Sequence, residues 1–99
     1  MIYKIISQTD PVAITTKKGQ SQKTTLVLQE LGGRKLTDDN GNVRYERAHV
    51  CTLFGNQVKF YPNELVAANF TSTAREYNGS WYDDNTINEI YKLTNNEPF

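Results

Sequence analysis

The chain has 99 residues, which is enough for one small domain but not for two separate cores. Its 37% hydrophobic and 22% charged residues are typical of a soluble globular protein, and no apolar run approaches the roughly 20 residues of a membrane-spanning helix. Eleven basic and eleven acidic residues give a formal net charge of zero, which disfavours a strongly electrostatic nucleic-acid binder.

The predicted elements are almost all strands, because β-branched and aromatic residues fill the apolar segments and turn residues recur at short intervals. The apolar start lacks a basic leader and a small-residue cleavage site, so it predicts a strand rather than a signal peptide. In chain order, the predicted strands cover residues 2–14, 23–31, 49–54, 65–76 and 81–93. The first strand is long and bends near Asp10-Pro11, since proline cannot donate a hydrogen bond to a strand ladder.

Four connections complete the pattern. Residues 15–22 predict a polar loop, and residues 34–47 predict an extended hairpin that turns at Asp39-Asn40-Gly41. Residues 58–64 form a connector too short for a helix, and residues 77–80 form a second hairpin turn. Five strands, the first long and bent, indicate an all-β fold with a small closed or partly open barrel. An SH3-like barrel and a small sandwich are the alternatives.

The domain is expected to span residues 1–93, followed at 94–99 by a short disordered tail that offers little to bury. Charge is uneven: residues 11–35 hold five basic residues and one acidic residue, whereas residues 83–99 hold four acidic and one basic. A basic front and an acidic rear are therefore compatible with zero net charge, with scattered solvated charges as the alternative. The single cysteine, Cys51, favours a reducing cytoplasm, and one cysteine with one histidine argues against a zinc site.

Three segments of the sequence carry a resemblance to known bacterial proteins. Residues 50–55 (VCTLFG) resemble the segment of that family in which an apolar strand ends in Leu-Phe-Gly. Residues 75–82 (REYNGSWY) look like a hairpin of short bacterial OB-fold proteins. The ending, Asn96-Glu97-Pro98-Phe99, is similar to the acidic C-terminal tip of the single-stranded DNA-binding proteins. The resemblance covers roughly residues 23–99 and implies a five-stranded OB-fold barrel and single-stranded DNA binding.

The chain also departs from that family. Its tail is shorter and carries one acidic residue, Glu97, which puts partner recruitment in doubt. The helix that usually follows the third strand is reduced to the short connector. The basic hairpin at residues 34–47 precedes the third strand instead of following it, so its chemistry is carried over but its alignment is not.

The candidate nucleic-acid-binding residues are rings that could stack on bases and cations that could meet phosphates. They are Lys17, Lys18, Lys23, Arg34, Lys35, Arg44, Tyr45, Arg47, Phe54, Arg75, Tyr77 and Trp81. Each has a plainer interpretation. Loop lysines are usually solubilising residues, and Tyr45 with Arg44 and Arg47 forms either an arginine–aromatic cluster or an ordinary solvated hairpin.

Strand alternation separates two sets of residues in the third strand. One set is Ala48, Val50, Thr52 and Phe54; the other is His49, Cys51 and Leu53. The resemblance implies that the first set faces DNA, with Phe54 as a stacking platform, while the alternative places Phe54 in the core. His49 is then expected to be a hydrogen-bonded structural residue and Cys51 a small buried one.

Trp81 and Tyr82 are adjacent on a strand and must face opposite sides. We expect Trp81 to be exposed and Tyr82 to be buried. The alternative is that Trp81 caps one end of the barrel.

The sequence therefore predicts a cytoplasmic protein that binds single-stranded DNA without sequence specificity in replication, recombination or repair. Homo-oligomerisation to a dimer or tetramer would join several binding faces. The resemblance implies that Glu97, Pro98 and Phe99 recruit replication or repair proteins. The alternative is an OB-fold protein-interaction module without nucleic-acid binding. No cofactor, metal, membrane partner or catalysis is expected. The acidic pairs Asp38-Asp39 and Asp83-Asp84 could hold Mg²⁺ in a nuclease, but they fall at turns or strand ends, where aspartates normally form turns. The sequence also shows no phosphate-binding glycine loop, nucleophile elbow or Cys/His constellation.

Overall fold

The computed structural model describes residues 1–55 and 58–93. These residues form eight strands and no helix, so they contain no helix long and apolar enough to cross a membrane. The strands are β1 (Ile2–Gln8), β2 (Val12–Thr16), β3 (Gly19–Glu30), β4 (Lys35–Thr37), β5 (Val43–Tyr45), β6 (Ala48–Phe54), β7 (Leu65–Tyr77) and β8 (Ser80–Lys92). The all-β prediction is confirmed. The predicted tail, with Glu97, Pro98 and Phe99, lies outside the described residues.

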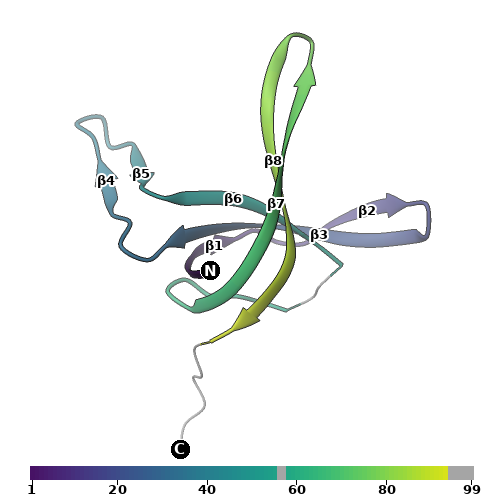
Figure 1. Cartoon of the computed structure of the whole chain (residues 1–99), viewed down its shortest axis with the longest axis horizontal. Coiled ribbons are helices and arrows are strands. Elements are labelled where there is room, and N and C mark those ends of the chain that lie inside the picture. The colour runs from purple at the N-terminus through teal and green to yellow at the C-terminus, as the bar shows by residue number, and fades with distance from the viewer. Residues whose placement is uncertain (56–57, 94–99) are drawn as a thin grey trace, which may run out of the picture.

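Five of the strands close into a ring of hydrogen-bonded neighbours. Their order is β1–β3–β6–β8–β7, and β7 pairs back with β1 (Figure 1). All neighbours are antiparallel except β6 and β8, which meet in parallel at Thr52 and Thr86. β7 therefore lies across the ring from the β3–β6 pair.

The first predicted strand is interrupted where the sequence places Asp10-Pro11. β1 and β2 both pair with β3, and the break between them is bridged by Thr9, whose N–H donates to the Thr25 carbonyl over 2.9 Å. The predicted loop at residues 15–22 is wrong. Thr16 pairs with Gly19, so the chain makes a tight turn and continues as paired strand. A ribbon exposed on both faces needs no apolar alternation, and its polar sequence therefore resembles a loop.

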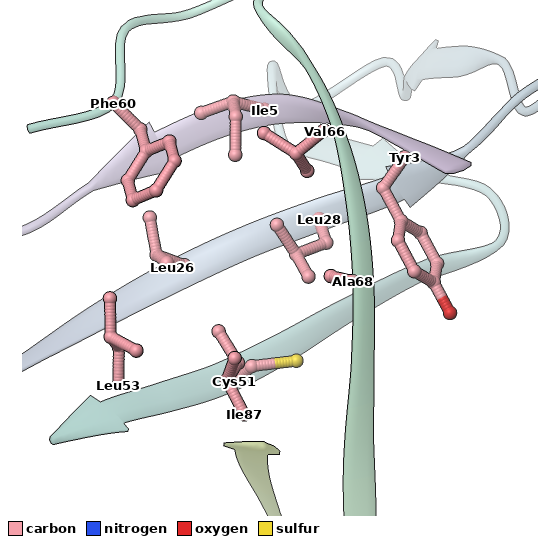
Figure 2. Close-up of a cluster of buried hydrophobic side chains, with 10 residues drawn as sticks. All are labelled: Tyr3, Ile5, Leu26, Leu28, Cys51, Leu53, Phe60, Val66, Ala68 and Ile87. Carbon is pink, nitrogen blue, oxygen red and sulfur yellow. The ribbon is translucent and has the colours of Figure 1, made fainter. Parts of the chain in front are cut away.

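The core fills the ring with side chains from alternate positions of the strands and with Phe60, which lies between β6 and β7 (Figure 2). Its members are Tyr3, Ile5, Leu26, Leu28, Cys51, Leu53, Phe60, Val66, Ala68 and Ile87. Because Cys51 is buried among them, loss of solvation raises the pKa of its thiol to about 11. Cys51 is thus a buried small residue, as the alternation predicted.

The connector after β6 is not helical, as predicted, and it fixes one end of the ring. The Asn63 N–H donates to the Ile5 carbonyl over 2.8 Å, and the Ile5 N–H donates to the Glu64 carbonyl over 2.9 Å. The buried Glu64 carboxylate accepts the Tyr61 N–H at 2.7 Å and pairs with Lys92 at 3.3 Å. These bonds hold the Phe60 side chain inside the ring.

Three hairpin arms project from the ring in different directions (Figure 1). We name them the β2–β3 arm (residues 12–23), the β4–β5 arm (residues 35–45) and the β7–β8 arm (residues 71–86). Every residue from 71 to 83 is exposed. The β7–β8 arm turns at Asn78 and Gly79, which both have positive φ, as a two-residue hairpin turn requires.

Candidate nucleic-acid interface

The outer surface of β3 and β6 forms the candidate interface. The pairing of β3 with β6 places three cross-strand pairs of side chains on this surface: Lys23 with Phe54, Thr25 with Thr52, and Val27 with Val50. We call these residues the β3–β6 wall. The residues between them on both strands are buried, so the predicted alternation of β6 is confirmed.

Phe54 lies on the wall and not in the core. Its side chain is 50% exposed, and Val50 on the same strand is 61% exposed. Lys23 pairs with Phe54 on one side and with Val12 on the other, so a cation lies directly beside the exposed ring. An exposed ring next to an ammonium group is the pairing that base stacking and phosphate contact require.

The wall carries one cation and no carboxylate, so further cations must come from the arms. Lys17 and Lys18 form the tip of the β2–β3 arm, and both are exposed. Neither makes an ion pair with any residue of 1–55 or 58–93, and the same holds for Lys23, Lys35 and Arg44. These five groups are therefore available to an external anion.

The β4–β5 arm separates residues that the sequence suggested would cluster. Lys35 pairs with Tyr45 on one face, whereas Arg44 pairs with Leu36 on the other. The predicted cluster of Tyr45 with Arg44 and Arg47 does not form. Arg44 and Tyr45 are neighbours on β5 and point to opposite faces, and Arg47 lies beyond β5 and pairs with Glu30. The ring beside a cation on this arm is instead Tyr45 beside Lys35.

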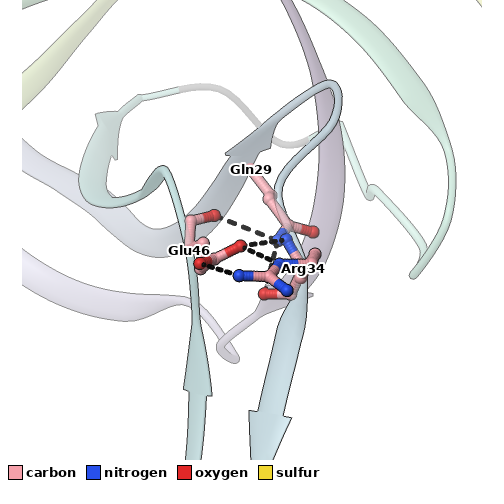
Figure 3. A network of polar contacts seen from close by, with 3 residues as sticks. All are labelled: Gln29, Arg34 and Glu46. Atoms are coloured by element: carbon pink, nitrogen blue, oxygen red, sulfur yellow. Dashed lines mark hydrogen bonds and ion pairs between the residues drawn. The ribbon is translucent and has the colours of Figure 1, made fainter.

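The base of the β4–β5 arm is fixed by a polar network (Figure 3). The Arg34 guanidinium donates to both Glu46 carboxylate oxygens, at 2.8 and 3.0 Å, and the buried Gln29 amide donates to the Glu46 carbonyl at 3.0 Å. The Arg34 guanidinium lowers the pKa of the Glu46 carboxyl below its usual value. A side chain at Gly33 would lie 2.4 Å from the Glu46 carbonyl oxygen, so this approach requires glycine. Arg34 thus orients the arm and is not a free cation.

A second network joins β3 to β6 beside that arm. Glu30 Oε2 lies 2.9 Å from His49 Nε2, and Glu30 Oε1 accepts a bond from Arg47 at 3.3 Å. The hydrogen bond from His49, followed by that from Arg47, lowers the pKa of the Glu30 carboxyl. The His49 ring also contacts Tyr3 and Phe70, with centroids 6.1 and 5.2 Å away. His49 is therefore a hydrogen-bonded structural residue, as predicted, and Arg47 is ion-paired.

The β7–β8 arm has two chemically different faces. Register places Arg75 opposite Tyr82 and Tyr77 opposite Ser80 on one face, with the Arg75 guanidinium 5.1 Å from the Tyr82 ring centroid. Arg75 also donates to Asp84 over 2.8 Å. The other face carries Trp81 opposite Glu76, together with Asp83.

Both aromatic residues after the turn are exposed. Trp81 is 68% exposed, as predicted, and does not cap the ring. The prediction that Tyr82 is buried is wrong, since its side chain is 47% exposed. The two do face opposite sides, but the arm extends past the ring, so neither side meets a neighbouring element.

A short bridge ties the β7–β8 arm to the wall. Asn85 Nδ2 donates to the Val50 carbonyl over 3.0 Å, and Ser72 Oγ donates to Asn85 Oδ1 over 2.6 Å. Sequence reasoning missed Asn85, Tyr82 and two residues on the β3 side of the wall, Thr25 and Val27. Alternation in residues 23–30 would have identified Thr25 and Val27, whereas no local signal marks Asn85.

No protein-family model matches the chain, and no curated protein sequence matches it. The residues and their geometry are therefore the basis for assigning a function.

Proposed function

We propose that the chain is an OB-fold protein that binds single-stranded DNA without sequence specificity, in replication, recombination or repair. The observation that carries this proposal is the exposed Phe54 ring beside the Lys23 ammonium on the β3–β6 wall. The wall lies among three arms (Figure 1), and the residues of these arms include further rings and cations.

The strand connectivity supports the OB-fold. An OB-fold is a five-stranded Greek-key barrel that binds oligonucleotides on the face of its second and third strands and on two of its loops. When β1 and β2 are counted as one bent strand, β3 and β6 become the second and third strands, and β7 and β8 the fourth and fifth. The β2–β3 and β7–β8 turns then correspond to the two binding loops.

The wall suits a ligand with flat bases and a flexible backbone. A base that stacks on Phe54 contributes about 1–3 kcal/mol whatever its identity, because every base has a π-face. Lys23 lies beside that ring and would meet the adjoining phosphate. Lys17 and Lys18 would extend the phosphate contacts along the β2–β3 arm, and Lys35 with Tyr45 would do so on the β4–β5 arm.

Binding is expected to be moderate in strength, with a shallow dependence on salt concentration. Three of the candidate arginines, Arg34, Arg47 and Arg75, are committed to carboxylates within the chain. Fewer free cations mean fewer counterions released from DNA. Homo-oligomerisation would compensate by joining several walls, and the Glu97-Pro98-Phe99 tip would recruit partner proteins.

Titration of fluorescently labelled oligo-dT tests the proposal. The wild-type chain should bind at low salt and weaken as salt is added. Phe54→Ala should reduce the affinity about 5- to 150-fold, which is the loss of one stacked base. The matched control is Tyr61→Ala, which removes a ring of similar exposure on the connector and should leave the affinity unchanged.

Two outcomes would contradict the proposal. One is a wild-type chain that does not bind oligo-dT at the lowest salt. The other is an equal effect of Phe54→Ala and Tyr61→Ala, because the wall would then have no special role.

A protein-interaction module is the second candidate. It is favoured by the apolar side chains of the wall, Val27, Val50 and Phe54, which outnumber its single cation. An exposed apolar patch of this kind commonly marks a protein partner. Partner capture that depends on Phe99, together with no DNA binding at low salt, would favour this function over the first.

A further inference from the structure

A second exposed apolar surface covers the outer side of β1, β7 and the end of β8. Its members are the apolar outward residues of these strands and Leu93, which directly follows β8. They are Ile2, Leu65, Ala67, Tyr91 and Leu93, and we call them the β1–β7–β8 face. Tyr91 is 63% exposed, whereas Tyr3 and Val66, whose positions alternate with the face, are buried. Contiguous apolar surface of this kind marks an interaction site more often than isolated apolar residues do.

The pairing register fixes the layout of this face. Ile2, Ala67 and Tyr91 form its central row. On one side of that row lie Lys4 and Leu65, which are paired, with Leu93 next to them. On the other side Asn69 pairs with Glu89.

Lys4 and Glu89 therefore occupy opposite corners of the face. Lys4 is on β1 below the central row and Glu89 is on β8 above it, with β7 between them. Lys4 makes no ion pair within the described residues, and the Glu89 carboxylate accepts only the Asn69 amide at 3.3 Å among the hydrogen bonds of that part of the chain. Opposite charges at opposite corners make the face complementary to itself.

We propose that the β1–β7–β8 face binds a second copy of this chain in a two-fold symmetric dimer. The two-fold axis lies in the contact plane and passes through Ala67. It is perpendicular to the diagonal that joins Lys4 to Glu89, so it exchanges these two corners. Lys4 of one copy then lies over Glu89 of the second, and the converse pair forms at the other corner. The apolar row is covered by its own counterpart, as an isologous interface requires.

This arrangement leaves both β3–β6 walls free. β7 lies across the ring from β3 and β6, so the two β3–β6 walls of the dimer face outward. The face is a small three-stranded patch, and interfaces below standard size are weak and dissociate on dilution. The dimer deepens the homo-oligomer part of the proposed function, but its contacts do not depend on DNA.

Charge-reversal variants test this dimer. Their association is measured by sedimentation velocity over a series of protein concentrations. The wild-type chain should form dimers that dissociate on dilution. Lys4→Glu and Glu89→Lys should each weaken the dimer at least about tenfold, because each places like charges together at both corners. The double variant Lys4→Glu/Glu89→Lys should restore the wild-type dimer, a rescue that a merely structural role would not give.

Two control variants separate this proposal from the others. Lys18→Glu makes the same charge change on the β2–β3 arm and should leave the dimer unchanged. Phe54→Ala should lose affinity for oligo-dT and keep the dimer, so failure of DNA binding and failure of dimerisation are distinguishable. A wild-type chain that stays monomeric throughout, a dimer indifferent to both single variants, or a double variant without recovery would each overturn the proposal.

Discussion

β7 and β8 each run through two regions that are stabilised by different interactions. Their inner halves line the ring, where Val66, Ala68 and Ile87 are buried. Their outer halves form the β7–β8 arm, where every residue from 71 to 83 is exposed. The inner halves are stabilised by apolar burial, which contributes about 25 cal/mol for each Å² removed from water.

The arm has no such contribution. It depends on the ladder between its two strands, on the Arg75–Asp84 ion pair and on the contact of Arg75 with Tyr82. Cross-strand pairs of this kind are worth about 0.2–1 kcal/mol each. The ring therefore determines stability, and side chains on the arm can be changed to test function without unfolding the chain.

The largest expected effect tests this division within one strand. Ile87→Ala on the ring half of β8 should lower the free energy of unfolding by about 2–5 kcal/mol, since it leaves a cavity in the core. Trp81→Ala on the arm half should lower it by no more than about 1 kcal/mol. Urea denaturation of both variants measures the difference. Equal destabilisation would show that the arm packs against another part of the protein in solution and contributes to stability as the ring does.

The next effect distinguishes the two faces of the arm. Tyr82 lies with Arg75 and Tyr77, whereas Trp81 lies with the carboxylates of Glu76 and Asp83, which repel phosphate. Tyr82→Ala should therefore weaken oligo-dT binding by about 1–3 kcal/mol, and Trp81→Ala by less. Labelled oligo-dT titrations of both variants provide the measurement. The reverse order would place the DNA on the acidic face.

A smaller effect is expected from releasing one arginine. Asp84→Asn removes the carboxylate that holds Arg75 and leaves the guanidinium free to meet a phosphate. The affinity for oligo-dT should rise about two- to fivefold at low salt, which is the range of an exposed ion pair. The salt dependence should become steeper, because one more cation displaces counterions. An unchanged affinity and slope would mean that Arg75 does not approach the ligand.

The smallest effect concerns the joint between the ring and the β4–β5 arm. The pKa of Glu30 in the folded chain is below its usual value because His49 and then Arg47 donate to it. A lowered carboxyl pKa contributes stability that is present above the unfolded pKa of about 4.5 and is lost as pH falls through the folded value. The Glu30→Gln variant should thus be less stable than wild type near neutral pH. The difference in the free energy of unfolding between the two proteins should disappear in acid. Denaturation curves of both proteins near neutral pH and in acid provide the measurement. A difference in stability that is the same at both pH values would mean that the ion pair has no role.

Local patterns in the sequence predicted the parts of the fold that depend on neighbouring residues. The alternation of β6 correctly separated Val50 and Phe54 from Cys51 and Leu53, and Asn78-Gly79 correctly marked a hairpin turn. The interruption at Asp10-Pro11 followed from the chemistry of proline alone. Each of these features is decided within a few residues of the chain.

The remaining features depend on partners that are distant in sequence. The prediction of a buried Tyr82 fails because a period of two shows that the two faces of a strand differ, but not whether either face meets a neighbouring element. The pairing of Arg34 with Glu46 and of Arg47 with Glu30 joins residues 12 and 17 positions apart. Counting cations along the chain therefore overstated those available to DNA. The binding of DNA by the wall residues stays a prediction.

The buried thiol of Cys51 has a practical consequence. Its pKa of about 11 leaves on the order of one thiolate in a thousand molecules near pH 8, and the side chain is enclosed by the ring. A thiol reagent can react only when the ring opens, while bending of the arms leaves the sulfur covered. The labelling rate of this single cysteine thus reports the rate at which the ring opens, and no engineered probe is needed.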